Sequence, residues 1–254
     1  MAIIDTHAHL DQLEDINGAL TRAHQAGVTD IIAVSVDLPS MRKVLDLGLR
    51  TQGIRIHPAL GLHPGMIKPE EQQEAFDFIT THIHQAVAVG ETGLDYWYKW
   101  VRKDESERRK QKDSFAFHLD MAKKFDLPIV IHSRGAWRDC LDMAKEAMVS
   151  RVLFHWYSGP VDILDQILSE GYYVSTSPSV AYSPQSITAM SHAPLERILI
   201  ETDSPVRYHQ GEEVYLAEPK DVIRTLNALA LLKDMNSKVV LDAVNKNARY
   251  FFRI

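Results

Sequence analysis

The chain has 254 residues, of which 45% are hydrophobic and 24% are charged, and its formal net charge is -6. This is the composition of an ordinary globular protein, and the length suits one large α/β domain or two small ones. The negative charge argues against a protein that coats DNA nonspecifically, although it permits a local basic patch around a phosphate site.

Short runs rich in Ile and Val alternate with amphipathic stretches of helical period. The runs are largely continuous in apolar character, which is typical of parallel strands covered on both faces. In chain order, the predicted strands are Ala2–His9, Asp30–Val36, Arg55–Leu62, Ala86–Glu91, Leu127–His132, Arg151–His155, Tyr172–Ser175 and Ile198–Glu201. The predicted helices are Ile16–Ala26, Ser40–Arg50, Pro69–Gln85, Glu107–Phe125, Ala136–Met148, Val161–Glu170, Pro184–Met190, Pro219–Leu232 and Ser237–Phe252.

This alternation predicts a single α/β domain over residues 1–254, a (β/α)8 TIM barrel. A doubly wound open sheet is the alternative. It usually has fewer strands, and no Gly-x-Gly-x-x-Gly follows the first predicted strand. In a barrel the carboxyl ends of all strands meet at one rim, which is where such enzymes carry their catalytic residues.

The first predicted strand ends in His7-Ala8-His9. Residues two apart on a strand share a face, so both imidazoles can reach one metal ion. One histidine at a strand end is often only a structural residue. Here several histidines and two acids follow strands, which is much harder to explain by packing; they are His7, His9, His63, Glu91, His132, His155 and Asp203.

These side chains are suited to a pair of metal ions. Imidazole and carboxylate are the usual protein ligands of Zn²⁺ and Mn²⁺, and carboxylate also suits Mg²⁺. Two ions about 3.5–4 Å apart lower the pKa of bound water toward ~7. Glu91, in the middle of the set, could bridge the ions, and Asp203 could exchange a proton with that water.

A loop rich in aromatic and basic residues follows Glu91. Interleaved aromatics and cations suit a strand of nucleic acid, and Trp97 and Tyr98 are the candidates closest to the site. A solvated helix start is the alternative explanation for the charges after Lys103. Arg134 and Arg207 lie just past two strand ends and could hold a phosphate.

The only cysteine, Cys140, excludes an intramolecular disulfide and is expected to be a small core residue in a reducing compartment. No apolar run reaches the roughly 18–20 residues of a membrane span, and no secretion signal is visible. We therefore expect a cytoplasmic protein that makes no membrane contact.

Long motifs occur in order over nearly the whole chain. They are Asp5–Asp11, Gly61–Gly65, Gly90–Tyr96, Leu127–Arg134, His155 with Ser158-Gly159, and Glu201–Pro205. Together they resemble the TatD family of metal-dependent hydrolases, which belongs to the amidohydrolase superfamily of (β/α)8 barrels. The studied members of that family are deoxyribonucleases.

The resemblance implies two divalent metal ions, with Mg²⁺ the usual activating ion and Zn²⁺ or Mn²⁺ also compatible. It places His7, His9 and Asp203 on one ion. It places His132 and His155 on the other ion, with Glu91 bridging the two. It further implies that His63 touches the scissile phosphate or its leaving group.

Several positions depart from the family pattern. Gly135 stands where Asp is usual, Trp156-Tyr157 replaces Cys-Phe, Val206-Arg207 replaces Tyr-Leu, and Ala217 directly precedes Glu218. All the expected ligands are kept. The departures therefore concern the substrate contacts and not the hydrolytic chemistry.

The sequence thus predicts a metal-dependent deoxyribonuclease, acting as an exonuclease on single-stranded DNA or DNA ends. One alternative is an amidohydrolase of a small ester, lactone or amide, because the same site would activate water for attack on a carbonyl. A second is a metal-binding or nucleic-acid-binding protein without catalysis. The sequence leaves the metal, the cleavage polarity and the oligomeric state open.

Overall fold

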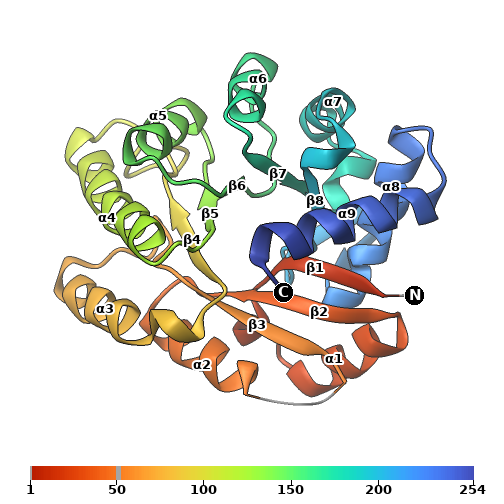
Figure 1. Ribbon diagram of the computed structural model, residues 1–254, viewed down its shortest axis with the longest axis horizontal. Coiled ribbons are helices and arrows are strands. Elements are labelled where there is room, and N and C mark those ends of the chain that lie inside the picture. The colour runs from red at the N-terminus through yellow and green to blue at the C-terminus, as the bar shows by residue number, and fades with distance from the viewer. Residues whose placement is uncertain (1, 50–52) are drawn as a thin grey trace.

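The computed structural model describes residues 2–49 and 53–254. Within this part, parallel strands form an eight-stranded sheet in the order β1 to β8, with helices around it (Figure 1). The strands are β1 (Ile3–Ala8), β2 (Val28–Val34), β3 (Arg55–Leu60), β4 (Ala88–Gly93), β5 (Ile129–His132), β6 (Val152–Phe154), β7 (Tyr173–Thr176) and β8 (Ile198–Ile200). The predicted (β/α)8 barrel is confirmed.

The helices fall between and after these strands, as the alternating pattern predicts. They are α1 (Ile16–Gln25), α2 (Leu38–Gly48), α3 (Pro69–His82), α4 (Glu105–Lys124), α5 (Trp137–Ala147), α6 (Val161–Ser169), α7 (Pro184–His192), α8 (Val222–Leu232) and α9 (Ser237–Phe252). Each strand pairs in parallel with the next, so every helix-containing connection returns the chain to the same end of the barrel.

The barrel closes where β1 meets the segment after β8. Ala8 and Ser204 form a parallel bridge, and the amide of His9 donates to the carbonyl of Ser204 at 2.8 Å. The amide of Asp203 donates to the carbonyl of His7 at 2.9 Å. Two sequence segments that carry predicted metal ligands are therefore joined directly by backbone hydrogen bonds.

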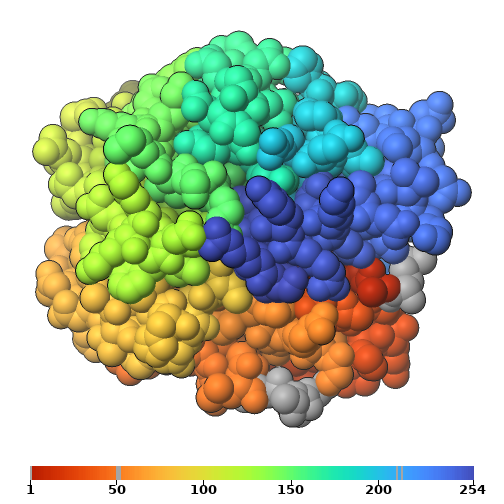
Figure 2. All heavy atoms as spheres, in the orientation of Figure 1, coloured from red at the N-terminus to blue at the C-terminus, as the bar shows by residue number. Residues whose placement is uncertain are grey.

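Apolar side chains fill the barrel interior. Each strand contributes to one buried cluster, which Ala248, Phe251 and Phe252 of α9 complete. Its strand members are Ile4, Ile32, Val34, Ala59, Ala88, Val130, Leu153, Tyr173 and Leu199. In Figures 1 and 2, α9 lies across the middle of the molecule near the C-terminus. The helix thus plugs one end of the barrel, and the polar residues described below occupy the other.

The structure differs from the prediction in two features, the start of the second helix and a hairpin after β8. The second helix, α2, begins at Leu38 and not at Ser40, because Asp37 caps it: its side chain accepts from the Ser40 amide, and the Ser40 hydroxyl accepts in return from the Asp37 amide. The predicted end of that helix, Arg50, lies outside the described residues. An antiparallel hairpin, β9 (Arg207–Gln210) and β10 (Glu213–Leu216), follows β8 and was not predicted.

Among the described residues, no helix combines the length and apolar character that crossing a membrane requires. Cys140 is buried in the core, as expected, between α5 and the end of β5.

Candidate metal centre

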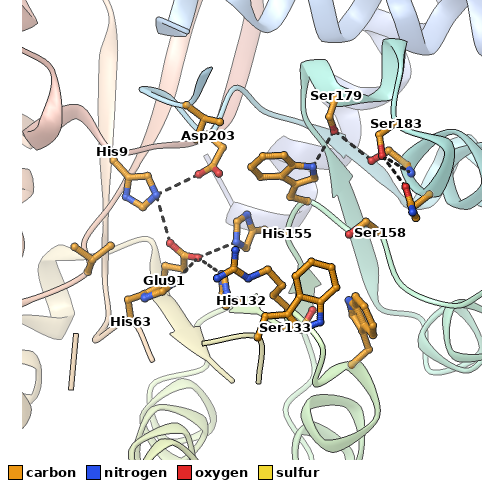
Figure 3. A pocket seen from close by; sticks show the side chains of 18 of the residues that line it. His9, His63, Glu91, His132, Ser133, His155, Ser158, Ser179, Ser183 and Asp203 are labelled. Carbon is orange, nitrogen blue, oxygen red and sulfur yellow. Dashed lines mark hydrogen bonds and ion pairs between the residues drawn. The ribbon is translucent and has the colours of Figure 1, made fainter. Parts of the chain in front are cut away.

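All six predicted metal ligands converge at the carboxyl ends of the strands. His7 lies on β1, Glu91 on β4 and His132 at the end of β5. His9 and His155 directly follow β1 and β6, and Asp203 lies in the segment after β8. Five of the six are at least nine-tenths buried, and His132 is partly buried. Figure 3 shows Glu91 in the centre, with His9 and Asp203 on one side and His132 and His155 on the other.

The first group of donor atoms lies around one oxygen of Glu91. The Nε2 atoms of His7 and His9 are each 3.4 Å from Glu91 Oε2. The same two nitrogens lie 3.4 and 3.2 Å from Oδ1 of Asp203. Within the described part of the chain, both ring nitrogens of His7, Nδ1 of His9 and Oδ1 of Asp203 make no hydrogen bond. Buried polar atoms normally have hydrogen-bond partners, so nitrogen and oxygen atoms without one, gathered in one place, fit as ligands of a divalent cation.

The second group lies around the other oxygen of the same carboxylate. Nδ1 of His132 is 2.9 Å and Nε2 of His155 is 2.8 Å from Glu91 Oε1. Because the two oxygens of Glu91 face different sets of imidazoles, this side chain has the geometry of a bridging ligand.

Two further acids orient the second pair of histidines. Asp95 Oδ2 lies 2.9 Å from Nε2 of His132, and Glu201 Oε1 lies 3.3 Å from Nδ1 of His155. Glu201 is itself held by the Ser175 hydroxyl at 2.5 Å. A carboxylate on one ring nitrogen orients the imidazole, so that the other nitrogen faces Glu91. Neither acid was predicted from the sequence to have a role, although Asp95 lies in the motif Gly90–Tyr96 and Glu201 directly follows β8.

The carboxylates of the centre are ionised at neutral pH. Burial acts to raise the pKa of Glu91, but the surrounding imidazoles, His155 first, outweigh burial and lower the pKa well below its usual range. Burial likewise acts against charge on Asp203, but the nearby imidazoles of His9 and His7 reverse that effect and lower its pKa. The centre therefore offers negative charge to cations.

His63 presents a hydrogen-bond donor to the centre. Its Nδ1 accepts from the Gly65 amide at 3.0 Å, and burial lowers the pKa of the imidazole to about 3, so the ring is neutral. The proton must then lie on Nε2, which is 3.7 Å from Glu91 Oε1. This tautomer suits a contact with a phosphate or a leaving oxygen and not a metal bond.

His118 supports the loop that carries His63. Its Nε2 accepts from the Leu62 amide at 3.0 Å, and its Nδ1 donates to the Ser114 carbonyl at 2.7 Å. His118 is completely buried, because α4 packs this face against the loop after β3.

A cavity of about 770 Å³ opens above the centre. Trp97, Tyr98 and Arg134 line it, together with the metal-facing side chains. Arg134 lies 2.8 Å from Asp95, with its guanidinium over the rings of Trp97 and Tyr98 at 5.9 and 5.3 Å. Arg207 does not line the cavity: it is exposed on β9.

A (β/α)8 barrel with two groups of His and carboxylate donors at the carboxyl rim defines a metal-dependent hydrolase. The family model described as TatD related DNase matches residues 4–253, and the chain therefore belongs to that family.

Relatives with known names cover almost the full chain. Deoxyribonuclease TATDN3 of Homo sapiens is 27% identical over an alignment 264 positions long, which covers 99% of this chain and 95% of the human protein. An uncharacterized metal-dependent hydrolase of Haemophilus influenzae is 29% identical and covers 99% of this chain and 100% of its own. The crystal structure of YJJV, a TatD homolog from Escherichia coli, superposes with a TM-score of 0.88 at 26% identity, covering 99% and 98% of the two chains.

Proposed function

We propose that the protein is a deoxyribonuclease that hydrolyses phosphodiester bonds with two divalent ions and acts as an exonuclease on single strands or strand ends. The observation that carries this proposal is the placement of Glu91, whose two oxygens face separate groups of imidazoles at 3.4 Å on one side and 2.8–2.9 Å on the other. Family membership and the deoxyribonuclease name of the human relative support DNA as the substrate. We place this activity in the cytoplasm.

Ions bound here would neutralise charge on the phosphate and supply an activated water; Mg²⁺, Mn²⁺ and Zn²⁺ all suit oxygen and imidazole donors. His7, His9 and Asp203 would hold one ion, His132 and His155 the other, and Glu91 would bridge them.

The protein groups have separate tasks. Asp203 is an ionised carboxylate at the rim, and it accepts a proton from the attacking water. His63 donates a hydrogen bond from its Nε2–H to a phosphate or leaving oxygen and keeps its proton, since its Nδ1 is already engaged by Gly65.

The DNA strand would lie along the wall formed by Trp97, Tyr98 and Arg134. Trp97 is 63% exposed, which leaves its indole available for stacking, and Tyr98 stacks on Trp100 at 4.3 Å. Arg134 is half-exposed and reaches the cavity with a guanidinium that can hold a phosphate. Arg207 lies outside the cavity and would contact DNA only farther along the strand.

The test is to strip the protein of metal and measure cleavage of single-stranded DNA after adding Mg²⁺, Mn²⁺ or Zn²⁺. We expect cleavage with at least one ion, and Glu91→Gln should lower it by orders of magnitude. Glu74→Gln on exposed α3 is the matched control. Folded protein that cleaves no DNA with any ion would refute the proposal, and hydrolysis of esters or lactones instead would favour the amidohydrolase alternative.

A further inference from the structure

The cavity extends beyond the metal centre into a second region, which we name the serine lobe. It is lined by Trp137, Trp156, Ser158, Ser179, Tyr182 and Ser183. Figure 3 shows Ser158, Ser179 and Ser183 on the side of the cavity away from His9, Glu91 and His63. None of these lobe residues is charged, and the chemistry proposed above uses none of them.

Trp156 is held rigidly between the centre and the lobe. It directly follows His155, its amide donates to the Ser175 hydroxyl at 3.1 Å, and its indole Nε1 donates to the Ser179 hydroxyl at 2.8 Å. Its ring also lies 5.6 Å from that of Tyr208. An aromatic platform fixed in advance loses little conformational entropy when a ligand stacks on it.

Two other aromatic side chains of the cavity, Trp137 and Trp97, pack closely against glycines. A Cβ added at Gly159 would lie 2.9 Å from the Trp137 ring, and one added at Gly135 would lie 2.3 Å from that of Trp97. Both rings therefore pack against backbone positions that carry no side chain.

The serine and aromatic side chains of the lobe favour a flat, uncharged ligand that has both hydrogen-bond donors and hydrogen-bond acceptors. Ser179 is buried and its hydroxyl is engaged by Trp156, Ser177 and Ser186. Ser158 and Ser183 are partly exposed, their hydroxyls can donate or accept, and an indole face stacks on any aromatic ring. A phosphate or a charged side chain would find no counter-charge on the lobe residues. An unpaired nucleobase meets all these conditions, whereas a base inside a duplex would first have to leave its stack.

We infer that the serine lobe holds the unpaired base of the nucleotide next to the scissile phosphate, stacked on Trp156, with little choice among the four bases. The inference rests on the proposed nuclease function, since it identifies which part of the DNA enters the cavity.

Binding tests the inference without any turnover. The Mg²⁺-loaded protein is titrated calorimetrically with each deoxynucleoside 5′-monophosphate and with 2-deoxyribose 5-phosphate, none of which contains a phosphodiester bond. We expect the nucleotides to bind at least about tenfold more tightly than the sugar phosphate, with similar affinities for all four bases. Trp156→Ala should remove this difference, Trp156→Phe should keep most of it, and Tyr250→Ala on exposed α9 should leave it unchanged.

Cleavage provides the second measurement. Single strands that end in a normal nucleotide should be cut with a kcat/KM about tenfold or more above that for strands ending in an abasic nucleotide, and Trp156→Ala should bring this ratio close to one. Equal binding of nucleotide and sugar phosphate, or a ratio of one in the wild-type protein, would overturn the inference. Base-dependent binding without cleavage of either strand would support the lobe and refute the nuclease function.

Discussion

The backbone amide of Asp203 donates a hydrogen bond to the carbonyl of His7 at 2.9 Å, across the seam that closes the barrel. Asp203 has a φ of 50°, in the left-handed region that Asp tolerates better than most residues. The position of its carboxylate is thus fixed by the backbone of the strand that carries the His-x-His pair. The same backbone hydrogen bond therefore closes the barrel and positions a candidate metal ligand.

Asp203→Asn should therefore separate chemistry from folding. The seam hydrogen bonds are made by backbone atoms, so the barrel should keep its thermal unfolding midpoint to within a few degrees. Cleavage of single-stranded DNA should fall by about 10²–10⁴-fold, because an amide cannot accept the proton of the attacking water. Asp77→Asn, on the exposed side of α3, is the control. Activity within threefold of the wild type would contradict this role.

His63→Ala should lower the rate without lowering metal content. The Nδ1 atom of His63 accepts from Gly65, so its Nε2 is a donor, and losing one donor to a developing charge costs about 10²–10³ in kcat. Elemental analysis of the purified variant should give the wild-type metal content. Loss of one ion from the variant would instead identify His63 as a ligand.

Asp95→Asn should weaken metal binding. Asp95 holds Nε2 of His132 at 2.9 Å and so directs Nδ1 toward Glu91. Outer carboxylates of this kind are typically worth about 10–100-fold in metal affinity. Calorimetric titration with Mn²⁺ or Zn²⁺ measures the change, with Asp120→Asn on exposed α4 as the control. An unchanged affinity would show that His132 needs no such partner.

Asp30→Asn should change stability and its pH dependence. Asp30 is buried at the start of β2 and pairs with Arg55 at 2.7 Å and His57 at 2.9 Å. Burial opposes its charge, but the hydrogen bonds with His57 and Arg55 prevail and lower the pKa of Asp30. The substitution should cost about 1–3 kcal/mol of unfolding free energy at pH 7.

The sign of the pH effect follows from that lowered pKa. A carboxylate with a depressed folded-state pKa stabilises the protein above its unfolded pKa of about 4 and loses this contribution as the pH falls further. The difference between wild type and variant should be constant from pH 7 to about 5 and shrink below pH 4. Urea unfolding at a series of pH values checks it, and a gap that widens in acid would refute the assignment.

The sequence by itself determined the barrel and the convergence of the metal-facing side chains. Continuous apolar runs separated by amphipathic helices predict parallel strands, and parallel strands place their carboxyl ends on one rim. Residues as distant in sequence as His7, Glu91 and Asp203 could therefore be brought together by pattern alone.

Only the tertiary structure decided how these side chains are held. Contacts between loops set the tautomer of His63, the burial of His118 and the partners of His132 and His155. Loop sequences have no hydrophobic periodicity from which such contacts could be predicted. The hairpin β9–β10 carries Arg207 away from the cavity, and Gly135 matters because of the Trp97 ring above it. Such features are set by packing among residues far apart in the chain, and a pattern of neighbouring residues cannot encode them.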